Sequence, residues 1–171
     1  MSTAPVARDA ILADIAIHFE KQRALAEGAL AQVDDRAFFA TLGEGDNSIA
    51  VIVKHMAGNL RSRFTDFLTS DGEKADRNRD GEFEIGRAES RAAVMEQWVR
   101  GWSTLLDTLR SLAPGDLGRT VFTRGEPATV QQALVRALVH QSQHAGQLAL
   151  LAKHFAGDAW RTLSIARRDR R

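Results

Sequence analysis

The segment LVHQSQHAGQLALLAKHF, residues 138–155, places His140 and His144 four residues apart in an otherwise largely apolar stretch. On a helix this spacing puts both side chains on one face, about 6 Å apart along the axis. Two imidazoles in this arrangement can bind one metal ion. The pair is also compatible with two ordinary histidines in the core or on the surface, so both interpretations stay open at this point.

A third histidine, His55, lies in VIVKHMAGN, next to Met56 and three residues after Ile52. These apolar neighbours indicate that His55 points inward from its own helix. Three histidines from two helices would leave positions on the ion open to water or substrate, as in catalytic rather than structural zinc sites. The alternative interpretation of His55 is a hydrogen-bonded core histidine.

The residues between His140 and His144 and the positions of the other histidines limit which metal-dependent reactions and which further ligands can be expected. A helical zinc protease needs a glutamate directly after the first histidine, but that position is Gln141, so a peptidase is not expected. His154 lies about 15 Å along the helix from His144, too far to share an ion, and its place near a helix C-terminus favours capping. No role is predicted for His18.

Three polar residues lie at helical phases close to these histidines. Asn59 is one turn beyond His55, Arg63 follows one turn later, and Gln147 is close to His144. Asn59 and Gln147 could hydrogen-bond a cofactor or substrate, and Arg63 could pair with an anionic carboxylate. We therefore predict these three as cofactor- or substrate-binding residues, and no catalytic residue is assigned.

The composition is that of a globular protein: 171 residues, of which 44% are hydrophobic and 26% charged. It predicts one domain over residues 1–171. The absence of cysteine excludes disulfides, zinc–thiolate sites and a cysteine nucleophile. The net charge of +1 argues against nucleic acid as a partner. Since there is no run of 18 apolar residues and no cleavable leader, we expect no membrane association and a cytoplasmic location.

Apolar residues at helical spacing predict four long helices, over approximately residues 5–33, 48–70, 90–112 and 129–157. Asp46, Asn47 and Ser48 are all good N-caps for the second helix, and Thr129 with Gln132 makes a capping-box pattern at the start of the fourth. Trp98 and Trp102 fall on the apolar stripe of the third helix. We expect both to pack in the core rather than to bind a ligand.

Two connections between the helices are unusual. Residues 71–90, DGEKADRNRDGEFEIGRAES, form a charged link that is longer than a bundle needs. Within it Arg77 and Arg79 could form an anion site, although charged loops are usually solvated. Residues 117–129, LGRTVFTRGEPAT, contain a short β-like stretch and a turn but no credible sheet. We therefore predict an all-α fold, a four-helix bundle with a long charged connection between its second and third helices.

Several stretches resemble the DinB-like superfamily, in a branch catalogued as a domain of unknown function: NSIAVIVKHMAGNLRSRFTDFLTSDGEKADRNRDGEFE, HQSQHAGQLALLAKHFAG and the closing WRTLSI. The resemblance covers nearly the whole chain, and TDFLTSDGEK…RNRDGEF is its most specific part. It implies a DinB-like four-helix bundle, a homodimer, and a divalent metal ion held by one histidine of the second helix and two of the fourth. The matching residues are His55, His140 and His144.

The resemblance also implies a class of activity, because the superfamily includes thiol S-transferases and isomerases that use low-molecular-weight thiols such as bacillithiol, mycothiol or glutathione. The chain departs from the family pattern between the last two histidines, where relatives often have aromatic residues. Gln141, Ser142 and Gln143 stand there instead. Since the chain contains no tyrosine, a tyrosine acid or base is excluded and a more polar pocket is expected.

Three hypotheses for the function follow. The first is a divalent-metal-dependent enzyme acting on a small-molecule substrate, either a thiol S-transferase or a related hydrolytic or detoxifying enzyme. The second is a non-enzymatic metal- or small-ligand-binding protein of the stress response. The third is a dimeric scaffold with no active metal site. Three histidines suit zinc or nickel best, and iron or copper also fit.

Overall fold

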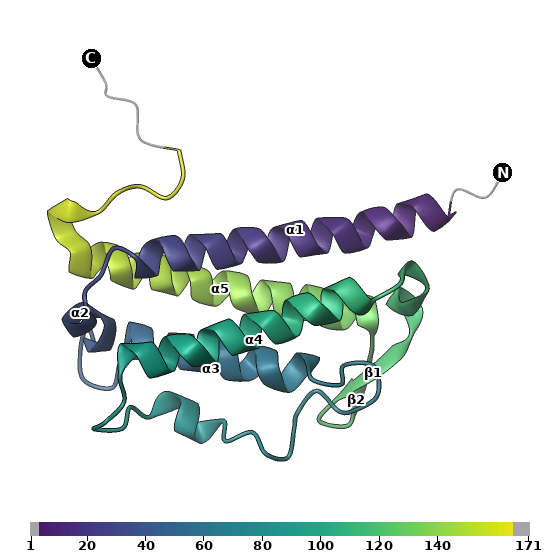
Figure 1. Cartoon of the computed structure of the whole chain (residues 1–171), viewed down its shortest axis with the longest axis horizontal. Coiled ribbons are helices and arrows are strands. Elements are labelled where there is room, and N and C mark those ends of the chain that lie inside the picture. Colours follow the sequence, from purple (N-terminus) through teal and green to yellow (C-terminus); the bar gives the residue numbers. More distant parts are fainter. Residues whose placement is uncertain (1–3, 166–171) are drawn as a thin grey trace.

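The computed structural model describes residues 4–165, most of which form helices that run side by side (Figure 1). The α-helices are α1 (Ala4–Leu30), α2 (Asp35–Phe39), α3 (Ile49–Phe64), α4 (Arg91–Ser111) and α5 (Val130–Ala156). Strands β1 (Thr120–Thr123) and β2 (Glu126–Thr129) form an antiparallel hairpin. Short 3-10 helices lie at Asp80–Phe83, Pro114–Gly118 and Gly157–Ala159.

The prediction of an all-α four-helix bundle is wrong. Within residues 4–165 the structure has five α-helices and a two-stranded antiparallel sheet, in which Thr120 pairs with Thr129 and Thr123 with Glu126. Helix α2 does not show in the sequence pattern because five residues are too few for a helical period. The sheet does not show because strands of four residues are too short for a clear alternation of apolar and polar side chains.

The hairpin closes through a two-residue turn, Arg124–Gly125, whose φ angles of 56° and 74° are both positive. Positive φ at both central positions matches the twist of the paired strands, and glycine adopts it without strain. The Asp71 carboxylate accepts hydrogen bonds from the backbone N–H groups of Arg124 and Gly125 at 2.8 Å each. The tip of the hairpin is therefore attached to the segment that follows α3.

The helix starts lie at candidate cap residues: of Asp46, Asn47 and Ser48, the last is the N-cap of α3, and Thr129 is the N-cap of α5. Ser48 and Thr129 each accept a hydrogen bond from a backbone N–H of the following turn, and Thr129 and Gln132 form the predicted capping box. Helix α3 ends at Phe64, before the predicted end at residue 70. The chain leaves the helix at Thr65, whose ψ of 127° is extended, and the positive φ of 47° at Asp66 turns it further away.

Residues 65–90 pack along α3 rather than extending into solvent (Figure 1). The Lys54 ammonium donates to the Glu84 backbone oxygen at 2.6 Å and to the Glu89 carboxylate at 2.9 Å. Ser62 Oγ donates to the Gly72 backbone oxygen at 2.9 Å. The long charged connection is therefore part of the packed fold.

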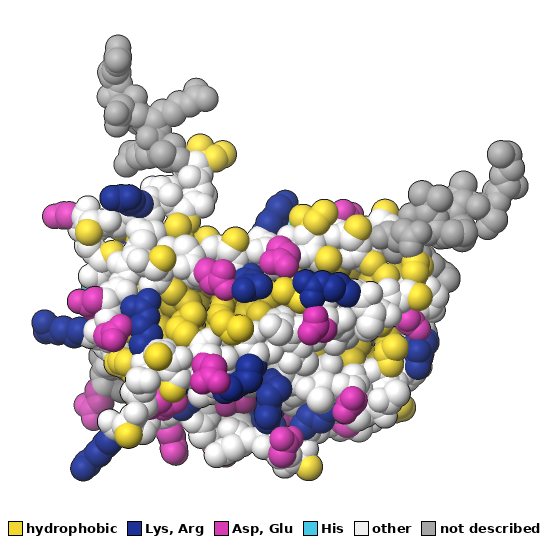
Figure 2. Space-filling view, in the orientation of Figure 1, with side chains coloured by type: hydrophobic (Ala, Val, Ile, Leu, Met, Phe, Trp, Pro, Cys, Tyr) yellow, Lys and Arg dark blue, Asp and Glu magenta, His cyan; other side chains and the backbone are white. Residues whose placement is uncertain are grey.

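The core lies between α1, α3, α4 and α5, with α1 packed against α5 and α3 against α4. Trp98 and Trp102 are fully buried, as predicted, and Phe19 meets Phe64 and Trp102 edge-on with ring centroids 6.5 and 6.4 Å apart. On the face that Figure 2 shows, hydrophobic side chains gather between α1 and α4 among charged ones. Among the helices described here, none is long and apolar enough to cross a membrane.

Gly101 of α4 lets this helix approach α3 closely. A Cβ atom at this position would lie 2.7 Å from the backbone oxygen of Ala57 and 3.0 Å from its Cα atom. Backbone atoms in a helix cannot move aside as the end of a flexible side chain can. Because Ala57 lies between His55 and Asn59, this contact also sets the position of the helix that carries predicted site residues.

We expect Gly101→Ala to lower the free energy of unfolding by about 1–3 kcal/mol, the usual cost of overpacking a tight contact. Gly146→Ala in α5 is the matched control, because a Cβ atom there meets no other atom within 4 Å. The control should raise stability by about 0.5–1 kcal/mol through the helix propensity of alanine. Urea unfolding followed by circular dichroism measures both changes. Equal effects of the two substitutions would contradict the close contact between α3 and α4.

Candidate metal centre

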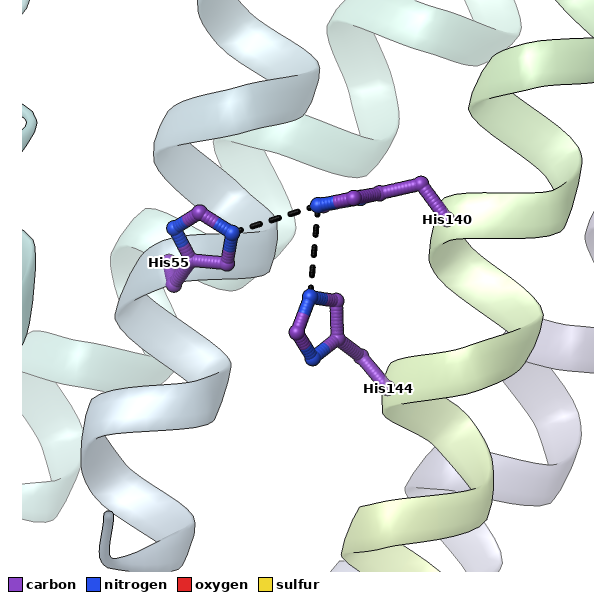
Figure 3. Close-up of side chains that lie close together, drawn as sticks. All are labelled: His55, His140 and His144. Atoms are coloured by element: carbon purple, nitrogen blue, oxygen red, sulfur yellow. Dashed lines mark hydrogen bonds between the residues drawn. The ribbon is translucent and has the colours of Figure 1, made fainter.

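His55 of α3 and His140 and His144 of α5 point toward one another (Figure 3). The Nε2 atom of His140 lies 3.2 Å from Nε2 of His55 and 3.2 Å from Nε2 of His144. One ring nitrogen from each residue lies within 4.8 Å of the other two. The structure therefore brings the three predicted ligands together, in a cluster that can hold a metal ion.

Hydrogen bonds at the outer ring nitrogens determine where the protons lie. His55 Nδ1 is 2.9 Å from Oε2 of Glu82, and His144 Nδ1 is 2.7 Å from Oε1 of Gln147. Because both partners are oxygen acceptors, the Nδ1 atoms carry protons, and in the neutral form of each ring Nε2 presents a lone pair. Both lone pairs face Nε2 of His140, and a single N–H at that atom could donate to only one of them.

A bound cation would satisfy these converging acceptor atoms. Zinc–nitrogen bonds of about 2.0–2.1 Å in tetrahedral geometry separate two ligand nitrogens by about 3.3 Å. The two distances of 3.2 Å in the cluster are close to this value. The three histidines therefore fit a divalent ion in the type and number of their nitrogen donors, and two of the three donor pairs also have the tetrahedral spacing, while the third lies within 4.8 Å.

Gln141 can act as the outer partner of His140. Its side chain is fully buried, its Nε2 lies 3.5 Å from His140 Nδ1, and its Oε1 has no hydrogen-bond partner within residues 4–165. The two ends of an amide are told apart only by their hydrogen bonds. With the amide turned by about 180°, Oε1 accepts a hydrogen bond from His140 Nδ1–H. Each of the three rings then has an acceptor at Nδ1 and a lone pair on the shared side.

Glu82 is a site residue that the sequence patterns do not indicate. It is buried in the 3-10 helix Asp80–Phe83, where Arg77 donates from Nε to Oε1 at 2.8 Å and from Nη2 to Oε2 at 2.9 Å. Gly58 leaves room for it, since a Cβ atom there would overlap the carboxylate. Burial by itself raises the pKa of Glu82, but hydrogen bonds from His55 and Arg77 outweigh burial and hold that pKa below its usual value. Glu82 is therefore an anion at neutral pH and orients the His55 ring.

A cavity of about 570 Å³ adjoins the cluster, and both His55 and His140 line it. Helices α3 and α5, the β1–β2 hairpin and residues of the 65–90 segment form its walls. Three aromatic rings contribute apolar surface, those of Phe64, Phe67 and Phe122. The histidine nitrogens thus lie next to a space that a small molecule can occupy.

The other residues selected from the sequence have different surroundings. Asn59 is buried and lines the cavity together with Arg63, whereas Gln147 is exposed and contacts a histidine of the cluster. Their assignment as binding residues stays a prediction. His18 and His154 are exposed and lie outside the cluster.

The surroundings keep the two histidines of α5 neutral. Burial, followed by the charges of His144, His55 and two arginines, lowers the pKa of His140 from 6.5 to about 3. Burial also lowers the pKa of His144, against the opposing effect of its hydrogen bond with Gln147. Neutral imidazole is the form that binds a metal ion.

Replacing the carboxylate partner of His55 should weaken metal binding. We expect Glu82→Gln to raise the Kd for zinc by about 10–100-fold, the range measured for lost partners of ligand histidines. The physical reason is that a neutral amide holds and polarises the imidazole less than a carboxylate does. Glu84→Gln is the matched control, because Glu84 is an exposed glutamate of the same segment. Competition with a chromophoric chelator measures both values, and equal affinities would show that His55 does not need the carboxylate.

Metal-free protein should lose stability as the pH falls below about 6.5. The unfolded chain then binds protons at His140 and His144, whereas the folded chain, with lowered pKa values at both, does not. The melting temperature in chelator should therefore be lower at about pH 5.5 than at about pH 7.5, a range above the titration of most carboxylates. A His140→Ala, His144→Ala variant should show a smaller decrease. An undiminished decrease in the variant would refute this assignment.

Comparison with known families finds one family model that matches nearly the whole chain. A family model with the description "Protein of unknown function (DUF1572)" matches residues 7–169. No curated protein and no solved structure matches the chain. The matched region includes all three clustered histidines and the 65–90 segment. Because the match covers most of the chain, the protein belongs to the DUF1572 family of proteins of unknown function.

Proposed function

We propose that this protein is a divalent-metal-dependent enzyme that acts on a small molecule in the cavity beside His55 and His140. The observation that carries the proposal is that two of the three clustered histidines line this cavity. A structural metal site has its ligands closed around the ion, whereas a catalytic site keeps a position open to substrate. A protein that only stores a metal ion and a scaffold would use the same fold without needing a cavity against the histidines. A non-enzymatic small-ligand-binding protein would also use the cavity, and the activity assay below separates it from an enzyme.

The chemistry that suits such a site is activation of a nucleophile. When bound, a divalent ion supplies positive charge that lowers the pKa of a thiol or a water molecule, so that its anion forms near neutral pH. Glu82 and Gln147 keep the protons of two rings on Nδ1, which leaves Nε2 free for the ion. Asn59 offers a buried amide at the cavity wall, where it could orient a substrate.

Of the two nucleophiles we propose a low-molecular-weight thiol, with hydrolysis by water as the related alternative. Support comes from the resemblance to the DinB-like superfamily and its thiol S-transferases, a resemblance that itself stays a prediction. Zinc and nickel are the ions we expect, and the three nitrogen donors also suit iron or copper. We also propose that the protein is a homodimer and is located in the cytoplasm. Light scattering of the purified protein measures its oligomeric state.

Metal content is the first test. Tag-free protein should contain about one divalent ion per chain by elemental analysis, and the His140→Ala, His144→Ala variant should contain none. A His18→Ala, His154→Ala variant is the matched control, since it removes two exposed histidines outside the cluster. The control should keep its ion. Failure of the wild-type protein to take up an ion on reconstitution would remove the basis of the proposal.

Activity is the second test. Ion-loaded protein should accelerate the conjugation of chlorodinitrobenzene with glutathione, bacillithiol or mycothiol, or the hydrolysis of an activated ester. The variant without His140 and His144 should lose at least about 100-fold in kcat/KM. If the loaded protein accelerates none of these reactions, the non-enzymatic binding protein becomes the better interpretation of the same site.

A further inference from the structure

The cavity beside the histidine cluster has an excess of positive charge. Its lining contains one acidic residue, Glu126, and five arginines, Arg63, Arg77, Arg79, Arg124 and Arg136. Folding gathers these arginines from α3, the 65–90 segment, the hairpin and α5. Like charges brought together around a partly enclosed space repel one another, and an anion bound there relieves the repulsion.

Acidic side chains nearby compensate for part of this charge. Glu82 is the bidentate partner of Arg77. The Glu73 carboxylate is shared among three arginines, with nitrogen–oxygen distances of 3.2 Å to Arg63, 3.4 Å to Arg77 and 3.1 Å to Arg124. Arg79 pairs with Asp80 at 3.8 Å. Glu82, Glu73, Asp80 and the lining residue Glu126 are four carboxylates against five guanidinium groups, so one positive charge is left over.

Two of the arginines have donor groups left for a ligand. Nη1 of Arg63 is buried and has no hydrogen-bond partner within residues 4–165. Arg136 is exposed and forms no ion pair within the same part of the chain. Burial first, and then the charges of Arg77, Arg136 and Arg124, lower the pKa of Arg63 against the effect of Glu73. A buried donor without an acceptor is costly, so a small turn of the Arg63 guanidinium that brought Nη1 to an oxygen of a ligand in the cavity would be favourable.

We infer that this cavity binds a small organic oxyanion, a carboxylate or phosphate group on an apolar body, with the anionic group paired to Arg63 and Arg136. The planar guanidinium matches the oxygens of either group. The apolar body would lie against Phe64, Phe67 and Phe122, which line the same space. The inference names the substrate class of the cavity and therefore rests on the proposed function.

The walls that carry these groups are held in place by the protein itself. The Asp71 carboxylate accepts hydrogen bonds from the backbone N–H of Glu73 at 2.7 Å and of Gly125 at 2.8 Å. Gly72 donates its backbone N–H to the Phe122 oxygen at 2.8 Å. These bonds join the hairpin to the 65–90 segment, so ordering of the walls on binding costs little.

Isothermal titration calorimetry with matched probes tests the inference. Phenylpropionate and phenyl phosphate carry the two oxyanions on an aromatic ring, and phenylpropionamide is the neutral analogue. With zinc-loaded protein we expect at least one anion to bind about tenfold or more tightly than the amide, as charge-assisted hydrogen bonds predict. The tighter of the two anions identifies the preferred group. An amide that binds as tightly as both anions would overturn the inference.

Arginine variants locate the binding. Arg63→Gln and Arg136→Gln should each raise the Kd of the preferred anion about tenfold or more and leave the Kd of the amide unchanged. Since Arg136 is exposed and its charge is repelled by the neighbouring arginines, its substitution should not lower the melting temperature, which separates lost binding from misfolding. Arg110→Gln is the control, because Arg110 pairs with Asp107 at the surface and lies outside the cavity lining. An unchanged Kd in both cavity variants would overturn the inference.

Titration of metal-free protein separates this inference from the proposed function. Anion binding that depends on Arg63 and Arg136 in both forms supports the inference even if the metal assay fails. Uptake of the ion without anion binding in either form overturns the inference and leaves the proposed metal site standing. The inference is also overturned if the anion binds only to zinc-loaded protein and its Kd is unchanged in the Arg63→Gln and Arg136→Gln variants, because the ion alone would then hold the anion.

Discussion

The buried carboxylate of Glu82 is the contact on which the geometry of the histidine cluster depends. It joins Arg77 of the 65–90 segment to His55 of α3 through hydrogen bonds of 2.8–2.9 Å. Without an acceptor at Nδ1, the His55 ring could carry its proton on Nε2, and its lone pair would no longer face His140. The carboxylate reaches this position only because Gly58 has no side chain. A helix glycine, an ion pair and a candidate metal ligand therefore form one structural unit.

The charged segment, residues 65–90, makes two sets of contacts in the fold. One side of the segment packs along α3, where Lys54 and Ser62 hold it by hydrogen bonds. The other side meets the hairpin through Asp71 and contributes arginines to the cavity wall. Residues that look like a solvated loop by composition thus connect the orientation of one histidine with the shape of the space beside it.

Periodicity in the sequence was sufficient for the long helices and for the pairing of His140 with His144. Both depend on the fixed geometry of an α-helix, in which residues four apart share a face whatever packs against them. The inward direction of His55 also followed from its apolar neighbours. The hairpin and α2 could not be recognised, because elements of four or five residues carry too few positions for a period. Glu82 could not be selected among the acids of its segment, since its role depends on the path of a chain without periodicity and on a gap left by Gly58.

The insertion of Glu82 over Gly58 has a consequence for how the protein responds to its surroundings. Glu82 of the 65–90 segment holds the ring of His55. The affinity of the ring for an ion and the docking of that segment would therefore be thermodynamically linked. An ion bound to the ring favours the docked segment, and whatever pulls the segment away weakens the ion's hold by the same factor. If the cluster holds an ion, its occupancy would thus be coupled through Glu82 to the docking of residues 65–90 at the surface.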